Sequence, residues 1–176
     1  ISWNILIESF VEHGLGEEAL ACLPKMQSEG LTPNVTTFTS SLKACRNIGA
    51  TNKGQDIHSE IERHGLLGED LVGNTLVDMY AKCGSIIHAK RTFDDITRPD
   101  AITWTTILAG YAQHGCGEEA FQLLGKMLKN NVSWDEITLV GVLSACSNSG
   151  LVQEGLHCFY LMNKLYGISW NSQHYA

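Results

Sequence analysis

The chain has 176 residues, of which 44% are hydrophobic, and it carries a formal net charge of −7. This apolar content is typical of a folded protein and argues against intrinsic disorder, and no apolar run approaches the roughly 20 residues that a membrane-spanning helix requires. The acidic charge argues against a protein that binds nucleic acid through charge alone.

Apolar residues recur at helical spacing from the start of the chain, as in Trp3, Leu6, Ile7 and Phe10. Glycines separate the apolar segments, and glycine readily adopts the left-handed backbone that ends a helix. We expect Ser85 to cap one helix and Pro24 to kink another. In chain order the pattern predicts ten helices, over Ser2–Glu12, Glu17–Glu29, Thr36–Arg46, Asn52–His64, Val72–Lys82, Ser85–Ile96, Ile102–His114, Glu118–Lys129, Glu136–Ser147 and Val152–Tyr166.

The sequence repeats itself at an offset of 101 residues. The segment around Trp3 returns around Trp104, and Leu42-Lys43-Ala44-Cys45 returns as Leu143-Ser144-Ala145-Cys146. This long period divides into units of 35, 35 and 31 residues, each containing two amphipathic segments around a glycine turn. Such a period predicts a stacked array, because a single helical hairpin cannot bury its own apolar face.

The predicted fold is therefore all-α, an α-solenoid of about five helix-turn-helix repeats forming a superhelix. The repeats cover residues 1–34, 35–69, 70–100, 101–135 and 136–171, and residues 172–176 begin a further repeat. We expect the chain to be part of a longer protein, and we expect its exposed ends to favour end-to-end self-association.

Three segments resemble plant pentatricopeptide repeat proteins, namely Trp3–Ile7, Asn74–Gly84 and Leu143–Val152. The unequal repeat lengths resemble the subclass that alternates P, L and S repeats. By this resemblance 1–34 and 101–135 are P-type, 35–69 and 136–171 are L-type, and 70–100 is S-type. The chain would then end before the C-terminal extension of such proteins.

The resemblance implies that the first helix of each repeat lines a groove for single-stranded RNA, with one base read by two side chains per repeat. One reading residue lies early in the first helix, and the other is the last residue of the repeat. The implied pairs are Asn4 with Asn34, Thr39 with Glu69 or Asp70, Asn74 with Asp100, Thr105 with Asp135, and Val140 with Asn171.

The same resemblance implies a base for three of the pairs: a pyrimidine for Asn4/Asn34, uridine for Asn74/Asp100 and guanosine for Thr105/Asp135. L-type repeats read weakly in the family, and Val140 has no polar atom to offer a base edge. A simpler alternative remains open, in which the polar residues only satisfy backbone groups at helix starts and turns.

The resemblance also assigns residues around each base. Ile1, Leu71 and Ile102 precede a reading residue by three positions and would sandwich the base. Lys82 would contact a phosphate. The equivalent positions in the other repeats lack a cation, which predicts weak affinity for the RNA backbone; they carry Glu12, Asn47, Gln113 and Asn148.

Nothing in the sequence predicts catalysis, a cofactor or a metal site. His58-Ser59-Glu60 matches part of a zinc deaminase motif, but no Cys-x-x-Cys follows it. The six cysteines are spread singly, as expected for packing residues in a reducing compartment.

Two functions stay open at this point. The first is a sequence-specific RNA-binding module of an organellar factor for RNA editing (C-to-U) or RNA processing. The resemblance places such a factor in a mitochondrion or chloroplast, with protein partners in an editing complex. The second is a peptide-binding solenoid of the tetratricopeptide type.

Overall fold

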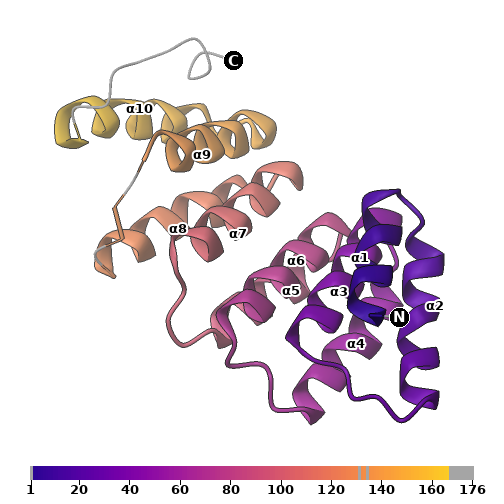
Figure 1. Ribbon diagram of the computed structural model, residues 1–176. Coiled ribbons are helices and arrows are strands. Elements are labelled where there is room, and N and C mark those ends of the chain that lie inside the picture. Colours follow the sequence, from indigo (N-terminus) through magenta and orange to yellow (C-terminus); the bar gives the residue numbers. More distant parts are fainter. Residues whose placement is uncertain (1, 131, 134, 167–176) are drawn as a thin grey trace. The chain divides into compact units, whose positions relative to one another are not determined.

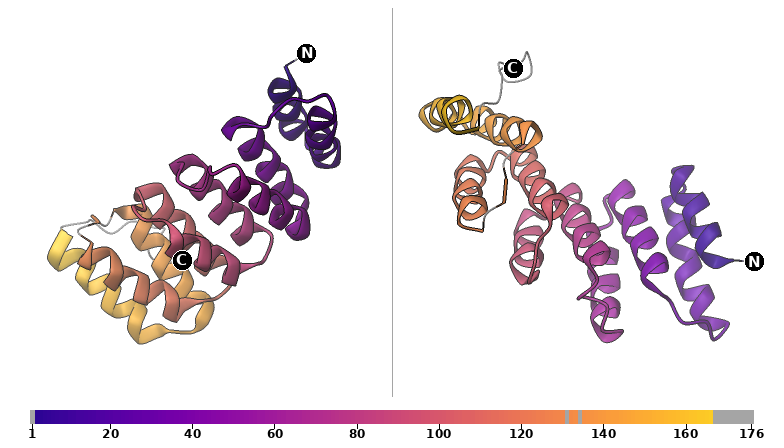
Figure 2. Two further views of the ribbon diagram at one scale, coloured as in Figure 1. Left: turned by 90° about the horizontal axis from the view of Figure 1, so that it is seen from below. Right: turned by 60° about the vertical axis from the view of Figure 1, so that its left-hand side comes forward.

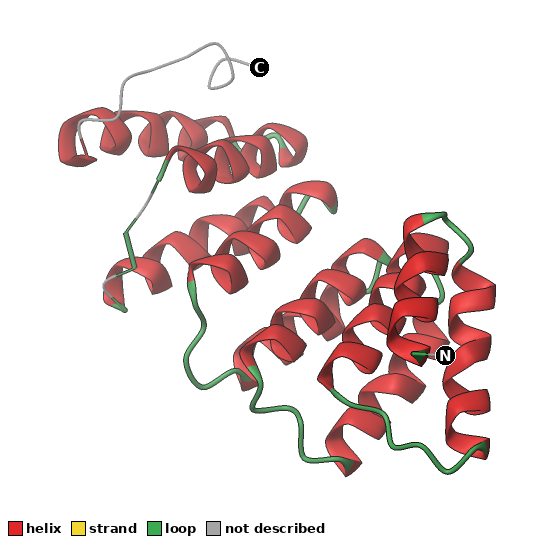
Figure 3. Cartoon of the chain, viewed as in Figure 1, coloured by secondary structure: helices red, strands yellow, loops and turns green. Residues whose placement is uncertain are grey.

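The computed structural model describes residues 2–130, 132–133 and 135–166, and gives the backbone alone for 161–166. All regular structure in this part of the chain is helical (Figure 3). The ten helices are α1 (Trp3–Glu12), α2 (Gly16–Ser28), α3 (Val35–Ile48), α4 (Thr51–Arg63), α5 (Asp70–Lys82), α6 (Ile86–Asp95), α7 (Ala101–Gln113), α8 (Gly117–Lys129), α9 (Glu136–Ser149) and α10 (Val152–Tyr166). The predicted all-α class is confirmed.

The chain forms two compact units, Ile1–Pro99 and Asp100–Ala176. In the first unit the helices form the hairpins α1–α2, α3–α4 and α5–α6, and α3 packs against both α1 and α5 (Figure 1). The second unit contains the hairpins α7–α8 and α9–α10, and α9 packs against both α7 and α8. Within each unit, consecutive hairpins therefore stack as in a solenoid (Figure 2).

The duplication seen in the sequence is also present in the helix bounds. Helices α2 and α8 begin and end 101 residues apart, and so do α3 and α9. Gly49 and Gly150 follow α3 and α9 in the left-handed conformation, both with φ +70. A side chain is strained in this conformation, so the glycines fix where the two helices stop.

The core is built from apolar side chains between neighbouring helices, from alanine up to tyrosine and tryptophan. At the start of the chain, Ile7 of α1, Ala19 and Cys22 of α2, and Ala44 of α3 form one buried cluster. In the second unit Trp104 is buried, as expected for a packing residue on the apolar stripe of α7. The cluster around Ile7 takes residues from two hairpins, so stacking creates the core there.

The structure describes two places where the sequence predicted a local feature. Ser85 lies at the N-cap position of α6, but its side chain forms no capping bond; its hydroxyl is instead 2.7 Å from Nδ1 of His88. Helix α2 runs from Gly16 to Ser28 with Pro24 inside it, and the kink at Pro24 stays a prediction. Pro24 is exposed, so water can solvate the carbonyl that loses its helical partner there. Across the described residues, no helix is long and apolar enough to cross a membrane.

Candidate nucleic-acid interface

The first predicted reading residue of each repeat lies near the start of the first helix of a hairpin. Thr39, Asn74, Thr105 and Val140 are each the fifth residue of their helix, on α3, α5, α7 and α9, and Asn4 lies in the first turn of α1. The side chains of Asn4, Asn74, Thr105 and Val140 are partly exposed. Thr39 differs, because only 4% of it is exposed.

The second predicted reading residue is a helix cap. Asn34, Asp100 and Asp135 are the N-caps of α3, α7 and α9, and each accepts a bond from the backbone N–H three residues later. All three have extended backbones, with ψ close to 180°. This conformation lets a short side chain reach back to the first turn of the helix. These three residues therefore cap their helices, and they are also exposed at the surface.

In the first unit the structure brings one predicted reading pair into direct contact. Nδ2 of Asn4 donates to Oδ1 of Asn34 over 3.3 Å. The buried hydroxyl of Thr37 joins them, lying 2.6 Å from Oδ1 of Asn4 and 3.1 Å from Oδ1 of Asn34. The two asparagines, 30 residues apart, thus form one polar cluster with a threonine that the sequence did not single out.

In the second unit the pair Thr105 and Asp135 is arranged differently. The Thr105 hydroxyl donates to its own helix, to the carbonyls of Ala101 at 3.0 Å and Ile102 at 3.1 Å. Partial burial acts to raise the pKa of Asp135, but the bonds from the Thr138 hydroxyl and backbone N–H outweigh it and hold this pKa below its usual 3.8. Asp135 is therefore a carboxylate at neutral pH, able only to accept hydrogen bonds.

The second repeat has neither an exposed first reading residue nor a capping bond at its last residue. The Thr39 hydroxyl donates to the carbonyl of Thr36 at 3.2 Å. At the end of that repeat, Glu69 is the N-cap of α5 but makes no side-chain capping bond, and Asp70 is the first residue of α5. Asn171, the predicted partner of Val140, lies outside the described residues.

Exposed aliphatic side chains accompany the reading positions. Leu71 is 58% exposed and Ile102 is 63% exposed, each three residues before a reading residue, while Ile1 is outside the described residues. Ile137 occupies the same place before Val140 and is 70% exposed. Ile137 was not among the residues predicted from the sequence, although the same three-residue spacing identifies it.

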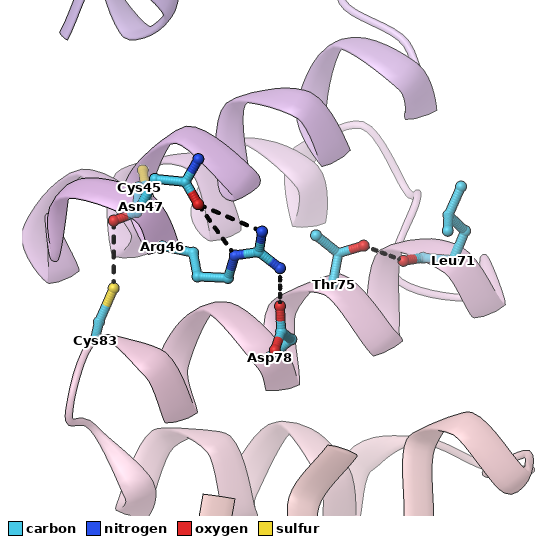
Figure 4. Close-up of polar contacts among 7 residues, drawn as sticks. All are labelled: Cys45, Arg46, Asn47, Leu71, Thr75, Asp78 and Cys83. Carbon is cyan, nitrogen blue, oxygen red and sulfur yellow. Dashed lines mark hydrogen bonds and ion pairs between the residues drawn. The ribbon is translucent and has the colours of Figure 1, made fainter. Parts of the chain in front are cut away.

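Cations are scarce near these helices. Lys82 is exposed at the end of α5. Arg46, at the end of α3, pairs with Asp78 of α5 at 2.8 Å (Figure 4). The described first helices therefore offer few cations to the phosphates of a nucleic acid, in keeping with the net charge of −7.

The histidine of the deaminase-like triplet has a packing role. Nδ1 of His58 is hydrogen-bonded to the Tyr80 hydroxyl at 3.0 Å, between α4 and α5. Burial lowers the pKa of His58 and raises that of Tyr80 to about 12, so both groups are neutral near pH 7. Among the described residues no group of three His, Cys, Asp or Glu side chains is placed to hold a metal ion.

Models of known protein families match most of the chain. A family model described as "PPR repeat family" matches residues 1–47 and 99–148, and one described as "PPR repeat" matches residues 74–98 and 137–165. Three pentatricopeptide repeat-containing proteins of Arabidopsis thaliana are similar to the chain: one at 43% identity over 96% of it, a chloroplastic one at 40% over 100%, and a mitochondrial one at 35% over 100%. The chain covers 28%, 21% and 20% of their respective lengths.

Solved structures share the fold at low sequence identity. The pentatricopeptide repeat protein PPR10, in complex with an 18-nt psaJ RNA element, matches 91% of this chain and 24% of its own, with a TM-score of 0.72 and 18% identity. The nuclear proteinaceous RNase P 2 of A. thaliana matches 98% of this chain and 40% of its own, with a TM-score of 0.75 and 12% identity.

Proposed function

The chain belongs to the pentatricopeptide repeat (PPR) family, and from this premise we propose that it is a sequence-specific single-stranded RNA-binding module that reads one base per competent repeat. PPR10, whose fold the chain shares, was solved with RNA bound. The observation that carries the proposal is the contact between Asn4 and Asn34, because it joins the two residues of a reading pair at the surface.

Recognition in this module relies on hydrogen bonds and stacking more than on charge. Leu71, Ile102 and Ile137 offer exposed apolar surface for the faces of bases. Lys82 provides a contact for one phosphate. With a net charge of −7, the five repeats alone bind RNA weakly, in the range of about micromolar to millimolar dissociation constants.

The proposed target is 5′-pyrimidine-N-U-G-N-3′ within a longer site. Asn4/Asn34 favours the pyrimidine, Asn74/Asp100 the uridine and Thr105/Asp135 the guanosine, whose ring N–H and amino groups are donors that a carboxylate accepts. The second repeat contributes no selection between bases, because Thr39 is buried. Val140 with Asn171 adds little selection, since valine has no polar side-chain atom.

The finer assignments follow from repeat type and from the relatives. The short third repeat, residues 70–100, suits an S-type repeat between L- and P-type neighbours. Relatives named chloroplastic and mitochondrial support an organellar protein. The part in RNA editing (C-to-U) or RNA processing follows from the resemblance to the P, L and S subclass. In that setting the chain supplies binding rather than catalysis, and protein partners of an editing complex supply the chemistry. Exposed Val152, Leu156 and Tyr160 on α10 support end-to-end association of the isolated chain.

The proposal is tested by substituting Thr105 with Asn in the complete chain. Binding is measured for four RNAs that differ only at the nucleotide assigned to Thr105/Asp135. We expect the preference to move from G to U, with a change in the G-to-U ratio of roughly tenfold. The control is Thr106→Asn, which adds the same amide at the next position of α7. If Thr105→Asn keeps the wild-type preference for G, the assignment of this nucleotide to Thr105/Asp135 is wrong. If the chain binds unrelated peptides as well as it binds RNA, a peptide-binding groove is favoured instead.

A further inference from the structure

Three buried threonines share a position that the base-reading scheme leaves unused. Each is the third residue of a helix whose N-cap is a reading residue, and each is almost fully buried, with Thr37 0%, Thr103 2% and Thr138 1% exposed. Their hydroxyls face the reading residues Asn34, Asp100 and Asp135, at distances of 3.1, 2.7 and 2.6 Å to Oδ1.

We propose that Thr37, Thr103 and Thr138 are positioning residues that set the orientation of the base-reading side chain at the end of the preceding repeat. This inference rests on the proposed RNA-binding function. The threonines do not touch the base; they act through Asn34, Asp100 and Asp135. Their contribution is to selectivity between bases, beyond the capping of the helices.

At Asp135 the geometry separates the two carboxylate oxygens. Oδ1 accepts the backbone N–H of Thr138 at 2.7 Å and the Thr138 hydroxyl at 2.6 Å. Neither bond uses Oδ2. A single bond to Oδ1 leaves the carboxylate freer to turn about its bond to Cβ, whereas a second bond to the same oxygen restricts that turn. Holding Oδ1 against the start of α9 limits where Oδ2 can point, and a carboxylate oxygen is an acceptor that suits the donors on the edge of guanine.

At Asn4 and Asn34 the threonine sets the direction of two amides. The Thr37 hydroxyl donates to Oδ1 of Asn4, and Nδ2 of Asn4 donates to Oδ1 of Asn34. Both amide oxygens are thereby occupied within the cluster. The amide N–H groups that remain are donors, and they match the acceptors that a pyrimidine presents at O2 and, for cytosine, at N3.

The second repeat shows the arrangement without the threonine. Its end residue Glu69 is the N-cap of α5, and the third residue of that helix is Val72. Glu69 makes no side-chain capping bond. This is also the repeat in which Thr39 is buried, so the lack of a positioning threonine coincides with a repeat that is poorly arranged for reading.

The test compares Thr138→Val, Thr138→Ser and wild type in the complete chain. The measured quantity is the ratio of dissociation constants for RNAs with A and with G at the nucleotide assigned to Thr105/Asp135. We expect Thr138→Val to reduce this ratio about three- to tenfold, as for loss of one hydrogen bond, and Thr138→Ser to restore it. The pKa of the Asp135 carboxyl, followed by NMR, should rise in Thr138→Val and return in Thr138→Ser.

The matched control is Thr75→Val. Thr75 is also a buried helical threonine, but its hydroxyl donates to the carbonyl of Leu71, within its own helix (Figure 4). This variant should lose stability while the A-to-G ratio stays at the wild-type value. Thr37→Val provides a second trial in the other unit, where we expect weaker preference for pyrimidines over purines at the Asn4/Asn34 nucleotide.

The outcomes separate the two proposals. If wild type prefers G and Thr138→Val keeps the same ratio and the same Asp135 pKa, the positioning role is wrong and the RNA-binding function stands. If wild type shows no preference at this nucleotide, the proposed function fails and the positioning role fails with it. Should Thr138→Val not fold, Thr37→Val decides by the same comparison.

Discussion

Arg46 and Asp78 join the first helices of two successive hairpins. NH1 of Arg46 lies 2.8 Å from Oδ2 of Asp78, and Oδ1 of Asn47 accepts from Nε and NH2 of the same guanidinium, each at 3.3 Å (Figure 4). The contact links α3 to α5, helices that belong to different repeats. Removing this contact would show how much an ion pair between repeats adds to the stability of hairpins that otherwise pack through apolar side chains.

We expect the Arg46–Asp78 pair to contribute little to stability. Its side chains are 37% and 29% exposed, and ion pairs at such positions typically contribute about 0–1 kcal/mol. A double-mutant cycle with Arg46→Gln and Asp78→Asn, measured by urea unfolding, should give a coupling energy below about 1 kcal/mol. A coupling of several kcal/mol would show that this pair, rather than the core, holds the second and third hairpins together.

Lys82→Gln should weaken RNA binding in a manner that depends on salt. Lys82 is exposed at the end of α5, and a phosphate contact releases a counterion from the RNA. The slope of log K against log salt concentration should fall by about 0.7 for a single strand. Lys90→Gln, on the second helix of the same hairpin, removes an exposed lysine away from the reading helices and should leave the slope unchanged. Equal slopes for wild type and Lys82→Gln would exclude the phosphate contact.

Acid should destabilise the first unit through His58. Burial lowers the pKa of His58 from 6.5, against the opposing effects of Glu62 and Asp95, while His88 lowers it further. The unfolded chain thus takes up a proton at a higher pH than the folded chain does, and the folded state is favoured above about pH 6.5. Stability should fall as the pH drops below this value.

Unfolding measured in urea between about pH 7 and pH 5 checks this effect. His58→Gln should lose less stability over that interval than wild type does. His13→Gln, whose ring is exposed at the end of α1, serves as the control and should follow wild type. Parallel pH profiles for His58→Gln and wild type would contradict the prediction.

Gly117→Ala should destabilise the second unit. A Cβ at this position would lie 2.6 Å from Oγ of Ser149 and 2.8 Å from Cδ1 of Leu151, where α8 begins close to the end of α9. Such crowding typically costs about 1–3 kcal/mol. The control is Gly125→Ala in the same helix, where a Cβ meets nothing within 4 Å.

Gly125→Ala should raise the free energy of unfolding by about 0.5–1 kcal/mol, because alanine has less backbone freedom to lose on folding. Thermal unfolding of both variants gives the comparison. If Gly117→Ala were as stable as Gly125→Ala, the close approach of α8 to Ser149 would be wrong.

Helix positions could be predicted from the sequence because each signal is local. Apolar spacing marks each helix, and a glycine such as Gly49 or Gly150 marks where it stops. The observed bounds differ from the expected ones by two residues or fewer, and α10 matches at both ends. The prediction that the Ser85 side chain caps α6 was wrong because of the backbone conformation of Ser85. Its ψ of 63 differs from the extended value at Asn34, so its hydroxyl turns to His88.

The contacts that join repeats could not be predicted, because they depend on how hairpins stack. The bond between Asn4 and Asn34 and the ion pair between Arg46 and Asp78 each connect residues about 30 positions apart. The positioning threonines had a sequence signal that was overlooked: Asn or Asp followed three residues later by Thr. The burial of Thr39 had no signal in the sequence, because Thr39 has the same spacing in its repeat as the exposed reading residues have in theirs.

The double duty of Asn34 and Asp135 limits how this chain can be redesigned or can evolve toward another RNA. A replacement there must still accept the N–H of Thr37 or Thr138, or the helix start loses about 0.5–2 kcal/mol. Lysine, arginine and the aliphatic residues offer no such short acceptor, so each of them would carry this cost. At Asn34 and Asp135, folding therefore restricts one of the two residues that would read a base.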